Sequence, residues 1–168
     1  MEDRFKRRRL VAVGAFALAI GLVPACGGDD SSSTAASSAA ATTGSTGDGG
    51  NVAVTLQEFA IAAAPASAPA GSVTFDVNNV GPNDVHEFVV IKTDLAPTEL
   101  PVDDMGVVDE KGAGIEPVDE IEDIPVGDTP SLTVDLEAGN YVLICNIYSE
   151  DEQEAHYSEG MRIGFTVE

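Results

Sequence analysis

The sequence predicts an all-β fold, a Greek-key β-sandwich, for residues 51–168. Short segments alternate apolar and polar residues, as Val73, Phe75 and Val77 do between polar neighbours. Glycine, proline and asparagine punctuate the chain between these segments, where turns are expected. The sequence shows no strong helical period, and short alternating strands joined by such turns are typical of a sandwich.

The strands are expected in the following order. The first covers 52–61, because Val52, Val54 and Leu56 alternate with smaller or polar residues. Residues 93–128 contain four prolines and many acids without a clear period, so we expect a long excursion there, with a short strand at 115–124 as its one regular element. The remaining strands are expected at 72–78, 86–92, 132–136, 141–145 and 163–167.

Two segments precede this predicted domain. Residues 1–25 combine a basic start with an apolar run too short for a membrane span, which is typical of a secretory signal. The run ends in Leu-Val-Pro-Ala before Cys26 and resembles the lipobox of bacterial lipoproteins. The resemblance implies cleavage before Cys26, a lipid on its sulfur, and a chain anchored to the outer face of the cell membrane. Residues 26–50 are small and polar and are expected to form a disordered tether.

An alternative to the lipoprotein signal is a plain secretory signal with a spare cysteine. The arginines near the N-terminus also leave open whether export follows the general secretory or the twin-arginine route.

The charge of the chain excludes some partners. The formal charge is −21, and removing residues 1–25 leaves three basic and 27 acidic residues, a charge of −24. Such a surface repels nucleic acid and anionic lipid headgroups and attracts basic proteins and metal cations. We therefore expect no nucleic-acid binding, and contact with the membrane through the lipid alone.

Four residues form a candidate metal site. The chain has two histidines, His86 and His156, and Cys145 is its one thiol besides Cys26. A lone thiol outside the cell oxidises if it is exposed, so a metal-bound thiolate explains Cys145 better than an idle one; an inert buried cysteine is the alternative. Two histidines, one cysteine and the nearby Met161 are the ligand types of a mononuclear copper site that transfers electrons.

Four motifs support this interpretation. They are Val-Thr-Phe-x-Val-x-Asn at 73–79, His-Glu-Phe-Val-Val at 86–90, Gly-x-Tyr-x-Leu-x-Cys-Asn at 139–146, and His-Tyr-x-x-Gly-Met-x-x-x-Phe-x-Val at 156–167. In this order they resemble the cupredoxins, the small blue copper proteins of the plastocyanin and azurin type. The resemblance implies a cupredoxin-like fold and one copper ion, cycling between Cu(I) and Cu(II), on His86, Cys145, His156 and Met161.

The chain departs from that family at two points. Ten residues separate Cys145 from His156, where the family usually has a shorter loop, and the extra length is acidic. This insertion either loops outward and leaves the ligands in place, or loosens the site and changes its geometry. Glu87 follows the first histidine where better-known members often have asparagine, so the hydrogen bond from that asparagine to the cysteine loop is absent or replaced.

We therefore expect a monomeric electron carrier, not an enzyme, whose redox partner has a basic docking patch. An alternative function is copper storage, delivery or sensing without electron transfer, which the acidic loop beside the ligands favours. A third is a metal-free interaction domain. A Cys/His nucleophilic pair lacks an orienting group in the sequence, and the acids of 99–123 do not match a calcium loop.

Overall fold

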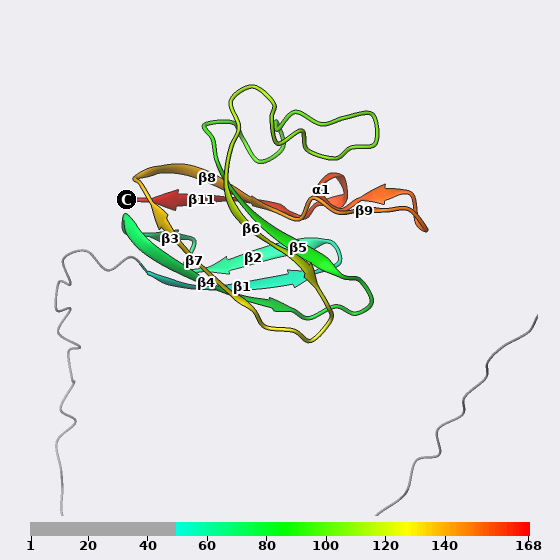
Figure 1. Ribbon diagram of the computed structural model, residues 1–168, viewed down its shortest axis with the longest axis horizontal. Coiled ribbons are helices and arrows are strands. Elements are labelled where there is room, and N and C mark those ends of the chain that lie inside the picture. The colour runs from blue at the N-terminus through cyan, green and yellow to red at the C-terminus, as the bar shows by residue number, and fades with distance from the viewer. Residues whose placement is uncertain (1–49) are drawn as a thin grey trace, which may run out of the picture. The chain divides into compact units, whose positions relative to one another are not determined.

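A computed structural model describes residues 50–168, which form two β-sheets packed face to face (Figure 1). The four-stranded sheet has the order β2-β1-β4-β7, and its strands are β1 (Asn51–Gln57), β2 (Ala60–Ala64), β4 (Gly71–Asn79) and β7 (Ser131–Leu136). The five-stranded sheet has the order β3-β11-β8-β5-β6, and its strands are β3 (Ser67–Ala68), β11 (Arg162–Val167), β8 (Gly139–Ile144), β5 (His86–Lys92) and β6 (Glu116–Ile124).

The core lies between the two sheets and follows from the alternation in the sequence. In β4, Val73, Phe75 and Val77 are fully buried while the residues between them are partly or fully exposed. The ring of Phe75 reaches across to Phe88 of β5 and Phe165 of β11, with centroids 5.3 and 5.4 Å apart. These tilted and edge-on contacts join the inner faces of both sheets.

The strand connections confirm the predicted all-β Greek-key sandwich. The chain changes sheets from β4 to β5, from β6 to β7 and again from β7 to β8. Strands that follow one another in sequence therefore often lie in opposite sheets. Most pairs are antiparallel, but β1 pairs with β4, and β3 with β11, in parallel. Within residues 50–168, no helix is long and apolar enough to cross a membrane.

The first predicted strand is corrected by the structure. The sequence suggested one strand over 52–61, but β1 ends at Gln57 and pairs with β2 in an antiparallel hairpin, with Gln57 opposite Ala60. Glu58 and Phe59 form the turn. This turn contains no glycine, proline or asparagine, so turn chemistry gave no signal of it.

The excursion after β5 contains a full strand at its end. Nine-residue β6 pairs with β5 along its length, with Phe88 opposite Ile121 and irregular register at two points. It lies at the edge of its sheet and exposes most of its side chains, which explains why it has no apolar alternation. The acids along this strand discourage pairing with other chains at that edge.

The rest of the excursion, residues 93–115, covers the outer face of the five-stranded sheet. Leu100 and Val108 are buried against Val89 and Ile91 of β5 and against neighbouring residues of β8. The central residues of β5 are therefore buried on both faces, as their continuous apolar sequence requires. We call residues 93–115 the cover segment.

The acidic insertion between Cys145 and His156 contains regular structure. Its ends pair as a small hairpin, β9 (Tyr148–Ser149) with β10 (Glu154–Ala155), which projects from the sandwich (Figure 1). The four-residue helix α1 (His156–Glu159) follows at once. The insertion loops outward, as one of the two expectations had it. Residues 1–49, with the predicted signal segment, Cys26 and most of the tether, lie outside the described residues.

Candidate metal centre

His86 is held in place by the loop that precedes β5. The side chain of Asn79 at the end of β4 is fully buried and donates hydrogen bonds to the carbonyl oxygens of Asp84 and Ile124, both 2.8 Å long. From the β1–β2 turn, Glu58 Oε1 accepts the backbone N–H groups of Asn83 and Asp84 at 2.9 and 2.6 Å. The backbone entering β5 is thus fixed from two sides.

Cys145 and His156 are placed by the ends of the loop between β8 and β11. Cys145 follows β8 directly, and its backbone N–H donates to the carbonyl of Met161 at 3.1 Å. The N–H of His156 donates to the carbonyl of Ile147 at 2.9 Å, which closes the loop below the β9–β10 hairpin. Because of this closure, the ten intervening residues do not carry His156 away from the sulfur.

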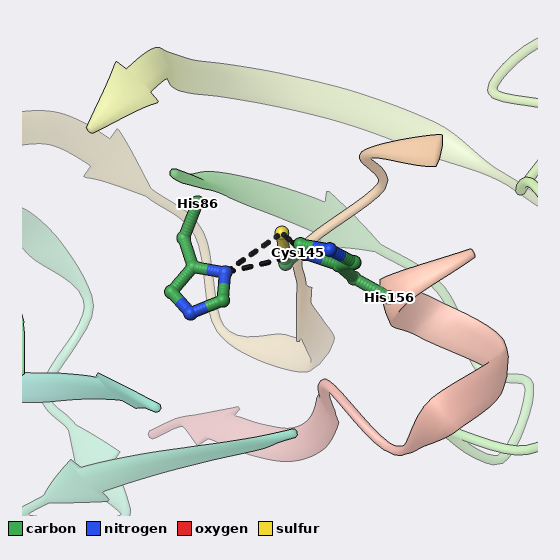
Figure 2. Close-up of side chains that lie close together, drawn as sticks. All are labelled: His86, Cys145 and His156. Atoms are coloured by element: carbon green, nitrogen blue, oxygen red, sulfur yellow. Dashed lines mark hydrogen bonds between the residues drawn. The ribbon is translucent and has the colours of Figure 1, made fainter. Parts of the chain in front are cut away.

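The three side chains converge on one point (Figure 2). Cys145 Sγ lies 3.9 Å from His86 Nδ1 and 3.4 Å from His156 Nδ1, and the two Nδ1 atoms are 3.2 Å apart. His86 and Cys145 are fully buried, and His156 is 1% exposed. Three metal-binding atoms thus face one another away from solvent.

The separations of these atoms fit a metal ion. A trigonal ion with bonds of about 2.0 Å to imidazole nitrogen and about 2.3 Å to thiolate sulfur needs ligand atoms about 3.5–3.8 Å apart. The observed separations of 3.2–3.9 Å span that range. Two imidazoles and one thiolate also match copper by donor type, and a structural zinc site would want a fourth strong donor.

Met161, the predicted fourth ligand, is also fully buried and belongs to the same core cluster as Cys145. Its carbonyl accepts the N–H of Cys145, and its own N–H donates to the carbonyl of His156 at 3.0 Å. Its backbone therefore bridges the two loop ligands. Its role as the axial ligand stays a prediction.

Burial sets the protonation of the metal-free site. It raises the pKa of the Cys145 thiol to about 12, against the opposing effect of the Ile147 and Glu87 N–H groups. Burial also lowers the pKa of His86, with the nearby His156 adding to the effect, and lowers that of His156. Without metal, the thiol and both imidazoles are therefore neutral at neutral pH.

Glu87 replaces the asparagine expected after the first histidine. Its backbone N–H donates to Cys145 Sγ at 3.3 Å, so the histidine and cysteine segments remain linked. Its carboxylate lies close to those of Glu110 and Glu120. Burial, and then the charges of Glu120, Glu110 and Glu122, raise the pKa of Glu87 to about 7, while the Asn146 backbone N–H opposes the rise.

The cover segment is tied to the loop between β8 and β11, which carries Cys145 and His156 and which we call the ligand loop. Asn146, next to Cys145, accepts the N–H of Val108 at 2.7 Å and donates to the Val108 carbonyl and to Glu110. The Tyr157 hydroxyl donates to the Pro97 carbonyl at 2.8 Å, and that of Ser158 to the Gly106 carbonyl at 2.8 Å. An excursion without sequence periodicity thus supports both loop ligands.

Two residues of the β1–β2 turn reach the site and were not predicted. The ring of Phe59 packs edge-on against His156 with centroids 5.2 Å apart. A carboxylate oxygen of Glu58 lies 3.9 Å from Nε2 of His86. Both lay within a segment interpreted as one strand, and no spacing in the sequence relates them to the histidines.

Comparisons with known proteins give structural neighbours only. No known family matches the chain, and no curated protein matches it. Among solved structures, a dithionite-reduced auracyanin from Roseiflexus castenholzii is 20% identical, covering 71% of this chain and 95% of its own, with a TM-score of 0.48. Auracyanin A from Chloroflexus aurantiacus, described as a "blue" copper protein, is 16% identical. The match covers 70% of this chain and 98% of auracyanin A, with a TM-score of 0.46. Rusticyanin from Thiobacillus ferrooxidans is 17% identical. The match covers 70% of this chain and 76% of rusticyanin, with a TM-score of 0.48.

The structure confirms two expectations drawn from the sequence. The fold is the expected β-sandwich of two packed sheets. His86, Cys145 and His156, which come from two separate parts of the sequence, meet in one buried cluster.

Proposed function

We propose that the chain is a mononuclear copper protein that carries single electrons between redox partners outside the cytoplasm. The observation that carries this proposal is the buried convergence of His86 Nδ1, His156 Nδ1 and Cys145 Sγ within 3.9 Å. With Met161 as a weak axial ligand, this donor set is the one that copper electron-transfer sites use. Bound copper supplies the one-electron couple Cu(I)/Cu(II).

The protein's own contribution is to hold the ligands still. His86 is fixed by hydrogen bonds to the preceding loop, and Cys145 and His156 by backbone bonds at both ends of theirs. A ligand set that is held before the metal arrives changes little when the metal changes charge. A small rearrangement favours fast electron transfer, and the chain acts as a carrier without a reaction of its own.

We also propose that the chain works at the outer face of the cell membrane, tethered by a lipid on Cys26. The basic start, the apolar run and the small residues before Cys26 support this location. In that place the acidic surface meets soluble or membrane-bound partners that carry a basic docking patch.

Voltammetry of the purified chain loaded with one equivalent of copper tests electron transfer. We expect a reversible one-electron wave whose peak separation stays small as the scan rate rises. An irreversible wave from a chain that still binds copper tightly would contradict the proposal. It would favour copper storage or delivery, the alternative suggested by the acids of the β9–β10 hairpin.

The acidic surface predicts how the rate of electron transfer depends on salt. Reduction by the cation hexaammineruthenium(II) should slow by about tenfold or more between 0.01 and 0.15 M ionic strength, since the Debye length falls from about 30 to about 8 Å. Stopped-flow loss of the visible copper band measures the rate. The anionic reductant ferrocyanide is the matched control and should react faster as salt is added. Equal salt dependence for both reductants would rule out electrostatic steering.

A further inference from the structure

The ring nitrogen of His86 that points away from the cluster has no partner of its own. Nδ1 faces His156 and Cys145, whereas Nε2 is buried without a hydrogen bond among residues 50–168. Among the acidic side chains of residues 50–168, the atom nearest to Nε2 is Glu58 Oε1, at 3.9 Å. The Glu58 side chain is 10% exposed, and its Oε2 is buried without a partner as well. A buried ring nitrogen without a partner thus lies near a carboxylate whose second oxygen, Oε2, also has no partner.

Metal binding makes this pair important. A neutral imidazole carries one proton, so a histidine that binds metal through Nδ1 must carry its proton on Nε2. A buried N–H group without an acceptor is unfavourable, because it has lost its hydrogen bond to water and gained none in the protein. In metal sites the second ring nitrogen is usually satisfied by a carboxylate or carbonyl, which sets the tautomer and the ring orientation.

Glu58 is itself held in position for this contact. Its Oε1 accepts two backbone N–H groups from the loop that leads into His86. Two N–H donors on one oxygen stabilise the negative form of the carboxylate. A shift of about 1 Å brings it from 3.9 Å into hydrogen-bond range of Nε2.

We propose that Glu58 is a positioning residue for the metal ligand His86: it accepts the Nε2–H group, leaves Nδ1 free for the metal, and favours Cu(II) over Cu(I) through its negative charge. This inference rests on the proposed function. The physical reason for the last effect is that a nearby negative charge stabilises the more positive ion. Glu58 therefore lowers the reduction potential of the site.

The test compares the full chain with its Glu58→Gln variant. Glutamine keeps an oxygen that can accept the N–H groups of Asn83 and Asp84, so the loop stays anchored while the charge is lost. We expect Cu(II) affinity to fall about 10–100-fold, which is the usual effect of losing such a partner. A tenfold loss of Cu(II) affinity relative to Cu(I) raises the reduction potential by about 59 mV.

Asp135→Asn is the matched control for charge. Asp135 is exposed on β7 and pairs with Ser72, seven residues before Asn79 on β4, which places it roughly 23 Å along the strand from the loop that holds His86. This variant removes the same charge and should leave the potential within the error of the wild-type value. Spectroelectrochemical titration measures the reduction potential of the wild type, of Glu58→Gln and of Asp135→Asn.

A second readout needs no copper. In ¹⁵N NMR spectra of the metal-free chain, which has only two histidines, we expect His86 to carry its proton on Nε2. In the Glu58→Gln variant we expect a mixture of both tautomers. Any one of three results overturns the proposal: an Nδ1–H tautomer in the wild type, no change of tautomer in the variant, or a potential shift no larger than that of Asp135→Asn. If the wild type bound no copper, the proposed function would fail, while the tautomer comparison would still decide whether Glu58 orients His86.

Discussion

Replacing Cys145 with serine is expected to abolish the intense visible absorption of the copper-loaded chain. The band arises from charge transfer between thiolate sulfur and Cu(II), and a serine hydroxyl supplies neither sulfur nor an anion. Serine is close to cysteine in size, so the fully buried position between β8 and the ligand loop should keep its shape. Absorption spectra after one equivalent of Cu(II), with a urea titration of each protein, separate loss of the ligand from loss of the fold.

Met161→Leu is the control for this experiment. Leucine conserves volume in the core and removes only the predicted axial sulfur, so the band should remain while the reduction potential changes. A band that survives in Cys145→Ser would show that the thiolate is not its source. The cluster of Cys145 with the two histidines would then not be the copper site.

Copper binding is expected to release one proton per ion at pH 7–9, so that the apparent affinity rises about tenfold for each pH unit. The sign follows from the metal-free site. The pKa of the Cys145 thiol is raised to about 12, so this group holds its proton across the range, and the lowered pKa values of His86 and His156 leave both rings neutral. The metal binds thiolate, so the thiol proton must leave.

Calorimetry in buffers with different ionisation enthalpies counts the released protons, and competition with a chelator of known pH dependence gives the affinity. Cys145→Ser is the matched control, because its residual copper binding should be nearly independent of pH above 7. Release of no proton by the wild type would mean that the thiolate forms before metal arrives or that copper binds elsewhere.

Much of the fold could be predicted because burial alternates with the sequence. Val73, Phe75 and Val77 point to the core at every second position, as the strand period requires. The strand predicted at 115–124 is confirmed as β6, although it lacks apolar alternation, because an edge strand held by backbone hydrogen bonds needs none. The β1–β2 turn at Glu58 and Phe59 was missed because its residues carry no turn signal.

The ligand types could be predicted for a different reason. The chain has only two histidines and one cysteine beyond Cys26, and His86, Cys145 and His156 each lie at the end or start of an expected strand or loop. Scarcity and order were enough to group them. The distances between their ring nitrogens and the sulfur were not predictable, because they depend on how two sheets pack.

By itself, the sequence determined the strand pattern, the donor atoms available for a metal and the strongly acidic charge, since each of these depends on local composition and order. Tertiary structure alone decided that the insertion projects outward, that the cover segment is tied to Asn146, and that Glu58 faces His86. These contacts join residues far apart in the chain, and side-chain spacing along one segment does not specify its neighbours on another. The environment of the candidate metal site is therefore a property of the packed sandwich, although its candidate ligands can be named from the sequence.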